Sequence, residues 1–503
     1  QKIQMKNNPG FDCVVGNPPY ITLALGKGQQ TANSLEIEYF RNTFKEAAQY
    51  KTNTYAIFLD QALRLSAQSG KAGMILPLTI LTNHFFADLR KELIGEHKID
   101  SIVEIRSNIF ADAEIGGNSI LILTARAVID NTKETVLCLE LDDSLRFNRK
   151  AQIEQAIFLS MPDFRLLTNK TTANLLSRLI KTNISLSSVA YFYNGIKTGD
   201  NNKFLSHTPI NSQYRQVIRG RDIDRYYLGF GGMWVLFDPA QLWSNTNQAM
   251  FETSPKIIIR QTGDTLMGAL DEEKYYTMDT THLIMPSVNP RYLLTLINSK
   301  LLNWCHSQIV PEEGKAFAEV KIVNIENLPI PNISFTTPEK ERKEFFKEAV
   351  KLYKGSKYED ILKWAEYELA MVRNDTIHDF LAYLAEQMIE LNKAKGNEIQ
   401  GFVKWLEREI GTEIDTLANK TAIKEYHDNN FNHLLDVLKK NKNKLTIDPS
   451  NRKIQELIEK HFTKSMSVLE PLKEKLKATD ELIDQIVYKL YGLTDEEIEI
   501  VEG

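Results

Sequence analysis

Short apolar runs alternate with segments of helical periodicity over the first third of the chain. Four runs have the length and composition of strands: Phe11–Gly16, Met74–Leu76, Ile99–Glu104 and Ile120–Thr124. Residues 35–67 and Phe85–Ile94 are compatible with helices. Strands separated by helices in this way predict a mainly parallel α/β sheet, and we expect Phe11–Gly16 to be a short buried strand within it.

The pattern changes twice further along the chain. Residues 176–335 are rich in Gly, Asn, Thr and aromatic residues and contain short β-runs such as Lys256–Arg260, which is typical of an irregular α+β domain. After Thr337-Pro338, which predict the start of a helix, the chain is rich in Lys and Glu at helical spacing.

Four segments follow from these changes. They are an α/β region at 1–145, a transition at 146–175, an α+β domain at 176–335 and a helical region at 336–503. Gly492 is expected to end the last long helix, and Thr494 with Glu497 forms a capping box for one more turn. The apolar face before Gly492 predicts that this helix docks on the α+β domain.

Composition narrows the class of protein. The chain has 503 residues, 25% charged residues and a net charge of −5, which suits a multidomain protein but does not by itself indicate nucleic acid. Its three cysteines are isolated, which predicts reduced thiols and a cytoplasmic location. No apolar run reaches the length of a membrane span, and no metal-ligand spacing of His or Cys appears.

Residues Asn17, Pro18, Pro19 and Tyr20 directly follow the first apolar run. The Asn17 side-chain oxygen can accept one hydrogen of an amine, and the carbonyl of Pro18 can accept the other. The two proline rings restrict the turn, so both acceptors are held in place before substrate binds. An amine that donates both hydrogens gains an available lone pair, and Tyr20 offers a ring for stacking. The alternative interpretation is a rigid turn after a strand.

With its flanks, this motif resembles the catalytic motif of N6-adenine DNA methyltransferases that carry a TaqI-like C-terminal specificity domain. Single-chain type IIG restriction–modification enzymes have this organisation. The resemblance continues through Asn53–Leu59 and Gly70–Pro77, and residues 191–335 with the last thirty or so resemble the specificity domain. Protein-glutamine methyltransferases share the Asn-Pro-Pro-Tyr motif.

The resemblance assigns roles to further residues. It implies S-adenosylmethionine as methyl donor and double-stranded DNA as partner, with the target adenine flipped out of the helix. Tyr20 and Phe110 then stack on the flipped base, and Phe58 packs on the adenine ring of the cofactor. The alternatives are an ordinary core residue for Phe110 and a helix residue facing the sheet for Phe58.

Candidate DNA contacts lie in the α+β domain. Between Lys197 and Arg225 there are six basic and three acidic residues, and a local excess of this kind can follow a phosphate backbone. It is equally compatible with a solvated loop or a tight turn. The predicted contacts are Lys197, Thr198, Asn201, Lys203, Arg219, Arg221, Arg260 and Gln261.

The chain departs from the family at its start. In the family, the glycine-rich cofactor loop precedes the catalytic motif, whereas only ten residues precede Phe11 here. We therefore expect an incomplete cofactor site and little activity from this chain alone. Mg²⁺ is expected only if a nuclease domain precedes Gln1. Asp264, Glu272 and Lys274 loosely resemble a nuclease triad, but we interpret this spacing as chance.

The sequence thus predicts a site-specific adenine-N6 DNA methyltransferase of a restriction–modification system. Two alternatives stay open. One is a DNA-binding specificity module without catalysis, and the other is protein-glutamine methylation. The second is disfavoured because several hundred residues follow the motif, which that reaction does not need.

Overall fold

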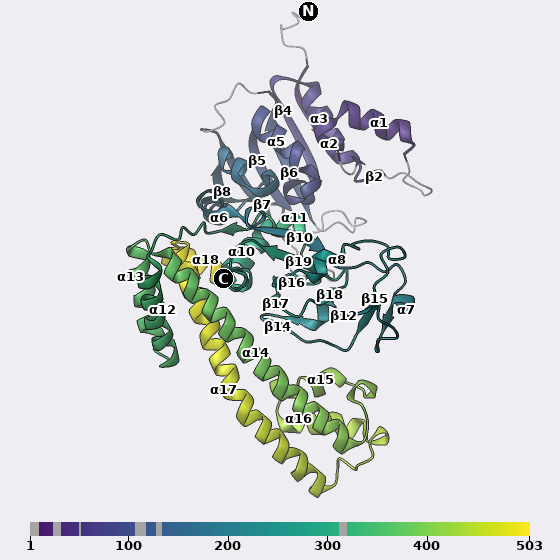
Figure 1. Cartoon of the computed structure of the whole chain (residues 1–503). Helices are drawn as coiled ribbons and strands as arrows, with labels where there is room; N and C mark the ends of the chain where they lie inside the picture. The colour runs from purple at the N-terminus through teal and green to yellow at the C-terminus, as the bar shows by residue number, and fades with distance from the viewer. Residues whose placement is uncertain (1–9, 24–31, 50–51, 106–116, 127–132, 311–318) are drawn as a thin grey trace, which may run out of the picture.

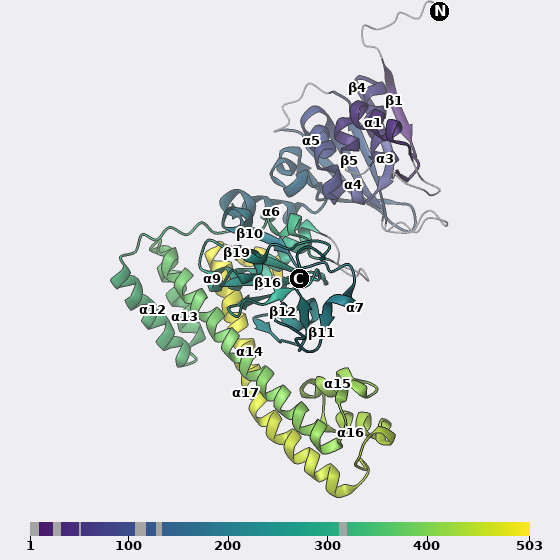
Figure 2. The ribbon, with the colours of Figure 1, turned by 45° about the vertical axis from the view of Figure 1, so that its right-hand side comes forward.

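The computed structural model describes residues 10–23, 32–49, 52–105, 117–126, 133–310 and 319–503. These residues form three parts in chain order: an α/β lobe, a middle lobe of short strands and helices, and a helical region that extends away from both (Figures 1 and 2). None of the helices in these described ranges combines the length and apolar character that a membrane span requires.

A six-stranded sheet organises the α/β lobe. Its strand order is β1-β4-β6-β5-β7-β8. The strands are β1 (Phe11–Gly16), β4 (Ser66–Pro77), β5 (Lys98–Ile105), β6 (Asn118–Thr124), β7 (Thr135–Leu141) and β8 (Phe147–Glu154). A further short pair joins β2 (Thr22–Leu23) to β3 (Thr52–Asn53) in antiparallel orientation.

Two sequence expectations for this sheet are wrong. The sheet is mixed rather than mainly parallel, because β6 inserts antiparallel between β4 and β5, and β8 pairs antiparallel with β7. Only β1–β4 and β5–β7 are parallel. In addition, β1 is an edge strand in the described part of the sheet, and Phe11 and Val15 are 61% and 79% exposed rather than buried.

Helices cover one face of the sheet near β1 and β4. Ala72, Met74 and Leu76 of β4 alternate into a core that also contains Leu59 and Leu93. Gly73 and Ile75, between them in sequence, belong to the opposite face, as the two-residue period of a strand requires. The helices of this lobe are α1 (Ser34–Thr43), α2 (Lys45–Ala48), α3 (Thr54–Leu65), α4 (Thr79–Thr82) and α5 (Ala87–Glu96).

The middle lobe contains two four-stranded sheets. The first has the order β10-β19-β16-β17 and the second β11-β15-β12-β18. An aromatic cluster fills the core, in which the rings of Phe251 and Tyr276 stack with centroids 5.0 Å apart. The strands of the first sheet are β10 (Ala190–Asn194), β16 (Lys256–Arg260), β17 (Gly268–Asp271) and β19 (Thr281–Pro286). Those of the second are β11 (Leu205–Ser206), β12 (Tyr214–Ile218), β15 (Trp234–Leu236) and β18 (Tyr276–Thr277).

Short strand pairs and helices complete this part of the chain. β9 pairs with β20 and β13 with β14, both antiparallel. The bounds are β9 (Ile184–Ser185), β13 (Ile223–Asp224), β14 (Tyr227–Leu228) and β20 (Pro329–Ile330). The helices are α6 (Lys170–Thr182), α7 (Asn201–Phe204), α8 (Gln248–Glu252), α9 (Pro290–Asn298), α10 (Lys300–Ile309) and α11 (Ile322–Ile325).

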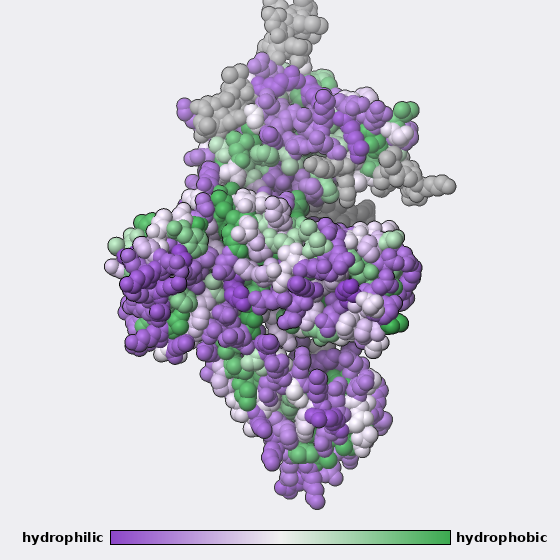
Figure 3. Space-filling view, viewed as in Figure 1, coloured by the Kyte–Doolittle hydropathy of each residue, from purple (hydrophilic) through white to green (hydrophobic). Residues whose placement is uncertain are grey.

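The helical C-terminal region is confirmed. Two long helices lie side by side as an arm, α14 (Asn374–Ile410) and α17 (Arg452–Leu490), with a small separate core at the far end (Figures 1 and 2). The surface of this far end is mostly hydrophilic in the view of Figure 3. The other helices are α12 (Glu339–Lys354), α13 (Tyr358–Ala370), α15 (Lys420–Lys424), α16 (Phe431–Lys440) and α18 (Asp495–Glu502).

Thr337 does not cap the helix that follows it, contrary to the sequence expectation. Its backbone N–H and hydroxyl donate to the buried carboxylate of Asp375 at 2.8 and 2.7 Å. Because Asp375 lies on α14, Thr337 instead ties the start of α12 to the arm. The expected capping box at Thr494 and Glu497 is present, and Gly492 has a φ of +62° at the helix end.

The C-terminal end of the chain packs against the middle of the sequence. Ile483, Ile486 and Val487 of α17 are fully buried in the main core. Arg225 forms an ion pair with Asp480 at 2.7 Å, which joins the middle lobe to α17. The base of the arm is therefore packed into the main core and paired with the middle lobe.

Candidate functional site

The loop Asn17–Tyr20 is fixed at the carboxyl end of β1. Gly16 packs so closely on Met74 of β4 that an added Cβ would lie 2.8 Å from its sulfur. The Thr54 hydroxyl, at the start of α3, donates to the Pro19 carbonyl at 2.5 Å. The Thr54 hydroxyl oxygen also accepts a hydrogen bond from the Ile21 N–H at 3.1 Å. Two elements far apart in sequence therefore hold this loop from both sides.

Tyr20 contributes to the same anchoring. Its hydroxyl donates to the carbonyl of Ile75 at 3.1 Å, and its ring meets the ring of Tyr55 edge to face at 6.0 Å. Partial burial raises the pKa of the Tyr20 phenol, so this donor stays protonated at neutral pH. The position of the Tyr20 ring is thus set by β4 and α3.

Asn17 and Pro18 differ in exposure. Pro18 is buried, whereas Asn17 is exposed, and its side chain makes no hydrogen bond to another residue in the described ranges. A fixed backbone that carries an unpaired amide is suited to bind a ligand that donates hydrogen bonds. The exposed Asn17 amide is thus available to a ligand, and the amine-binding roles of the Asn17 oxygen and the Pro18 carbonyl stay predictions.

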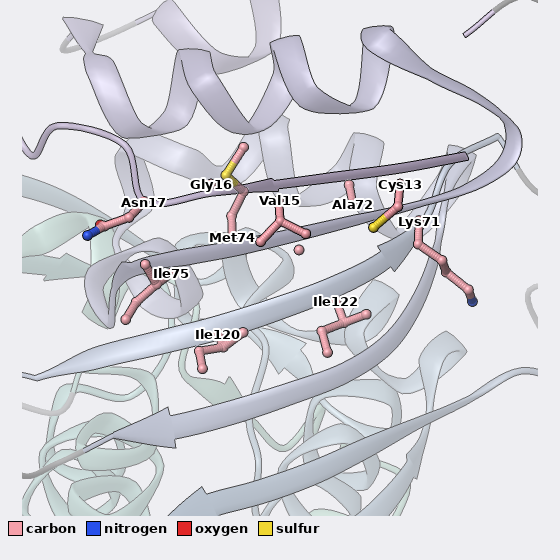
Figure 4. Close-up of a pocket in the computed structure, with 11 residues that line it drawn as sticks. Cys13, Val15, Gly16, Asn17, Lys71, Ala72, Met74, Ile75, Ile120 and Ile122 are labelled. Atoms are coloured by element: carbon pink, nitrogen blue, oxygen red, sulfur yellow. The ribbon is translucent and has the colours of Figure 1, made fainter. Parts of the chain in front are cut away.

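An apolar cavity of about 510 Å³ extends from Asn17 along the open face of the sheet (Figure 4). Val15, Ile75, Ile120 and Ile122 line its middle, and Lys71 lies at the far end. Lys71 is paired with Asp100 at 2.9 Å. This lining offers few groups for the charged and ribose parts of S-adenosylmethionine, so we do not assign the cavity to the cofactor.

The other two residues predicted around the reaction centre have different outcomes. Phe58 lies on α3 and is 47% exposed, so it does not face the sheet, and its ring is available for stacking. Phe110 lies outside the described residues. The stacking roles of Tyr20 and Phe110 and the cofactor role of Phe58 stay predictions.

A second group of predicted residues meets around the turn that joins β18 to β19. The Thr280 hydroxyl accepts from the Gly220 N–H at 2.9 Å, and the Thr280 carbonyl accepts from the Gln261 N–H at 2.9 Å. Gly195 packs against the Met278 carbonyl so closely that a side chain would clash with it. The segments that carry Lys197, Arg219, Arg221, Arg260 and Gln261 therefore all converge on this turn.

Lys197 lies over an exposed tryptophan that the sequence analysis did not select. Its ammonium is 5.1 Å from the ring centroid of Trp243, which is 72% exposed. The Lys197 carbonyl also accepts a hydrogen bond from the backbone N–H of Trp243 at 3.0 Å. An exposed aromatic face beside a cation is a common surface for nucleic acid. In the sequence, the only sign that Trp243 could bind a ligand is that it is a single Trp within a polar loop.

The remaining predicted contacts are engaged to different degrees. Arg219 is bound by both oxygens of Asp222, whereas Arg221 in the same turn is exposed. Lys203 donates to Gln241 at 2.7 Å. The others make short local bonds: Thr198 to Asn201 at 2.6 Å and Arg260 to Thr262 at 3.3 Å.

The loose nuclease triad does not form a cluster. Strand β17 separates Asp264 from Glu272, and Glu272 is bound to Arg291 at 3.0 Å. Carboxylates gather elsewhere, on α2, α3 and α5, where oxygens of Glu46, Asp60 and Glu92 all lie within 4.8 Å of one another. Arg64 pairs with Asp60 at 2.6 Å, which compensates part of this charge.

Glu92 is expected to make stability depend on pH. Burial, followed by the charges of Asp60 and Glu46, raises its pKa from 4.5 to about 7. The folded state therefore holds a proton that the unfolded state has released between these values, so stability falls as pH rises from about 4.5 to about 7 and changes little above that. Glu92→Gln should be more stable than wild type above pH 7 by about 1–3 kcal/mol.

Denaturant unfolding at pH values below and above 7 measures this effect. Glu38→Gln, on the exposed face of α1, is the control and should keep the wild-type pH profile. Equal pH profiles for Glu92→Gln and wild type would contradict the expectation.

Three segments of the chain match models of known protein families. Residues 1–110 match the model of the Eco57I restriction-modification methylase, and residues 215–330 match the TaqI-like C-terminal specificity domain. Residues 374–487, which include most of the arm, match a domain of unknown function. No curated protein sequence is similar enough to count as a match.

Several solved structures resemble the chain at low identity. The type IIL restriction-modification enzyme MmeI in complex with DNA is 10% identical, with a TM-score of 0.40 over 90% of this chain and 57% of that one. The type IIG restriction endonuclease BpuSI is 12% identical, with a TM-score of 0.28 over 66% of this chain and 48% of that one. The chain thus spans about half the length of these enzymes.

The methylase model contains the first group of residues described above, and the specificity model contains part of the second, because Lys197 and Lys203 precede residue 215. The Asn17 loop lies inside the methylase model, and the Arg221, Arg260 and Gln261 segments lie inside the specificity model. The chain therefore contains a restriction–modification methylase domain of the Eco57I type followed by a TaqI-like C-terminal specificity domain.

Proposed function

We propose that this chain takes part in methyl transfer from S-adenosylmethionine to the N6 atom of adenine within a defined double-stranded DNA sequence. The observation that carries the proposal is the Asn17 loop. Its backbone is held by Thr54 and Tyr20, while the Asn17 amide is exposed and unpaired among the described residues. Such preorganised acceptors stabilise an amine nitrogen as its lone pair becomes nucleophilic.

The roles of the chain's own residues follow from this arrangement. The Asn17 oxygen and the Pro18 carbonyl accept the two amine hydrogens, so the nitrogen lone pair is directed away from both. Tyr20 supplies a ring whose position is fixed before the base arrives. S-adenosylmethionine supplies the methyl group, and the exposed Phe58 ring is the group on this chain that we assign to its adenine.

Adenine is distinguished from other acceptors by product analysis. The enzyme that contains this chain is incubated with tritiated S-adenosylmethionine and DNA, and the DNA is then digested to nucleosides. Label in N6-methyladenine supports the proposal. Label in methylated cytosine, or in a protein substrate instead of DNA, contradicts it.

We propose that the surface around the β18–β19 turn reads the DNA sequence. Lys197→Ala and Arg221→Ala should each weaken DNA binding, because both residues sit on this surface and Arg221 is exposed. A base contact is worth about 1–3 kcal/mol and its loss relaxes specificity at one position, whereas a phosphate contact weakens all sequences alike. Binding to the preferred site and to a scrambled duplex separates these cases.

Arg219→Ala provides a comparison within the same turn. Since Asp222 already binds the Arg219 guanidinium, this change should mainly lower the stability of the turn. If Lys197→Ala and Arg221→Ala both match wild type on both duplexes, the DNA-reading surface lies elsewhere.

A further inference from the structure

A second cavity lies between the α/β lobe and the middle lobe. It has a volume of about 320 Å³ and is more polar than the cavity beside Asn17. One wall comes from α4 and the residues after it, and the other from α10, α11 and Lys321. Among the described residues that line it, none is acidic.

The lining is rich in hydrogen-bond donors. Lys321 is exposed at the rim, where its only acidic neighbour given by the structure is Glu319, 3.7 Å away. His84, Asn83 and Thr82 line the same wall, and each has a side chain that can donate a hydrogen bond. Donors of this kind without a carboxylate among them favour an anion.

A buried arginine gives the cavity its charge. Arg165 is only 3% exposed, and it binds the Thr82 carbonyl, Asp163 and Asn324 through two of its nitrogens. Its third nitrogen, Nη1, is buried and has no hydrogen-bond partner among the described residues. Burial lowers the pKa of Arg165 to about 10, so the side chain is still a cation at neutral pH.

A second buried arginine adds to this charge. Arg90 is fully buried, and its guanidinium donates to the carbonyls of Ile80, Asn83 and Asp163, while no carboxylate of a described residue contacts it. Burial and the neighbouring charge of Arg165 lower its pKa to about 9. The Asp163 carboxylate pairs with Arg165 at 2.9 Å, and Glu326 lies nearby, where burial and then the charge of Asp163 raise the pKa of its carboxyl group. An anion in the cavity would give the buried Arg165 Nη1 the hydrogen-bond acceptor that it lacks among the described residues.

Residues of the cavity wall, or next to it, contact residues of both predicted sites, the Asn17 loop and the β18–β19 turn. On one side, Thr79 of its wall contacts the Tyr55 hydroxyl at 3.3 Å, and the Tyr55 ring packs on Tyr20. On the other side, Val320, next to Lys321, donates its N–H to the Gln261 carbonyl at 2.8 Å. An anion bound here is therefore close both to the catalytic loop and to the DNA-reading turn.

We propose that this cavity binds a backbone phosphate of double-stranded DNA, with Lys321 and the Arg165 guanidinium as the cationic groups. The inference rests on the proposed function, since it takes DNA as the substrate. A phosphodiester is an anion that can accept hydrogen bonds from Lys321 and Arg165, and one bound at this position holds the strand between the proposed catalytic lobe and the proposed DNA-reading lobe.

Salt-dependent binding tests the site. Affinity for a labelled mixed-sequence duplex is measured at several salt concentrations for wild type, Lys321→Gln and Val323→Phe. Val323 lines the cavity on α11, so the phenylalanine fills the space without changing charge. Both variants should bind more weakly and lose about one phosphate contact, so that a fourfold rise in salt weakens them about 3.5-fold less than wild type.

Controls separate this inference from the proposed function. Lys347→Gln, on the exposed surface of α12, should match wild type, and thermal unfolding shows that each variant is folded. Wild-type affinity and salt dependence in both Lys321→Gln and Val323→Phe would overturn the phosphate site and leave the proposed function standing. Failure of wild type to bind duplex DNA would overturn both.

Discussion

Replacing Asn17 with alanine is expected to lower the rate of methyl transfer by about 10²–10³-fold in the enzyme that contains this chain. The change removes one of the two acceptors that polarise the amine, and it does so at the reacting atom. DNA affinity should change little, because phosphate and base contacts elsewhere supply it. Tritium transfer from S-adenosylmethionine and a mobility-shift assay measure the two quantities side by side.

The position of Asn17 makes this a clean experiment. Its side chain is exposed and makes no hydrogen bond to another described residue, so truncation should not disturb the fold. Asn17→Asp keeps an accepting oxygen and should retain more activity than Asn17→Ala. Near-normal transfer by the alanine variant would remove Asn17 from the mechanism, and parallel loss of DNA binding would point to a structural role.

The sequence predicted the site loop because its chemistry is local. A strand followed by Asn17-Pro18-Pro19-Tyr20 places an amide, a carbonyl and a ring within four residues, and the prolines restrict their geometry. What the motif could not predict is how the loop is held. Thr54 and Ile75 are distant in sequence, and the bonds that they make to Pro19 and Tyr20 depend on how α3 and β4 pack.

In the sheet, too, the sequence predicted the local elements but not how they pack. The runs at Ile99–Glu104 and Ile120–Thr124 were correctly predicted as strands, which the structure extends by one or two residues. Their direction was not, because apolar content says nothing about which neighbour a strand pairs with. The segments that connect the strands decide that β6 inserts between β4 and β5. This antiparallel insertion makes the sheet mixed.

The local excess of basic residues does not show which side chains are available to DNA. Arg219 and Arg221 contribute equally to the local positive excess, yet Asp222 binds one and leaves the other exposed. The buried cations Arg90 and Arg165 lie outside the counted segment altogether. A residue's contribution to a binding surface depends on its partners, and these are set by tertiary contacts.

The largest expected loss of stability follows from Lys256→Met in the middle lobe. Lys256 and Asp271 are fully buried and form an ion pair at 2.5 Å where β16 pairs with β17. The ammonium also donates to the carbonyls of Phe251 and Thr253 at 2.6 and 3.2 Å, which satisfies all three of its hydrogens. Methionine leaves the Asp271 charge buried without a cation, at a cost of about 3–5 kcal/mol.

Denaturant unfolding of the single and double variants tests this account. Asp271→Asn, added to Lys256→Met, removes the uncompensated charge and should restore about 1–2 kcal/mol of the loss. The control is Lys274→Met, because Lys274 is exposed just beyond β17 and its loss should cost less than about 0.5 kcal/mol. A Lys256→Met variant as stable as the Lys274→Met control would show that water or a shifted backbone replaces the ammonium. Since β16 ends at Arg260, next to Gln261, the Lys256→Met variant should also bind DNA more weakly under conditions where the α/β lobe is still folded.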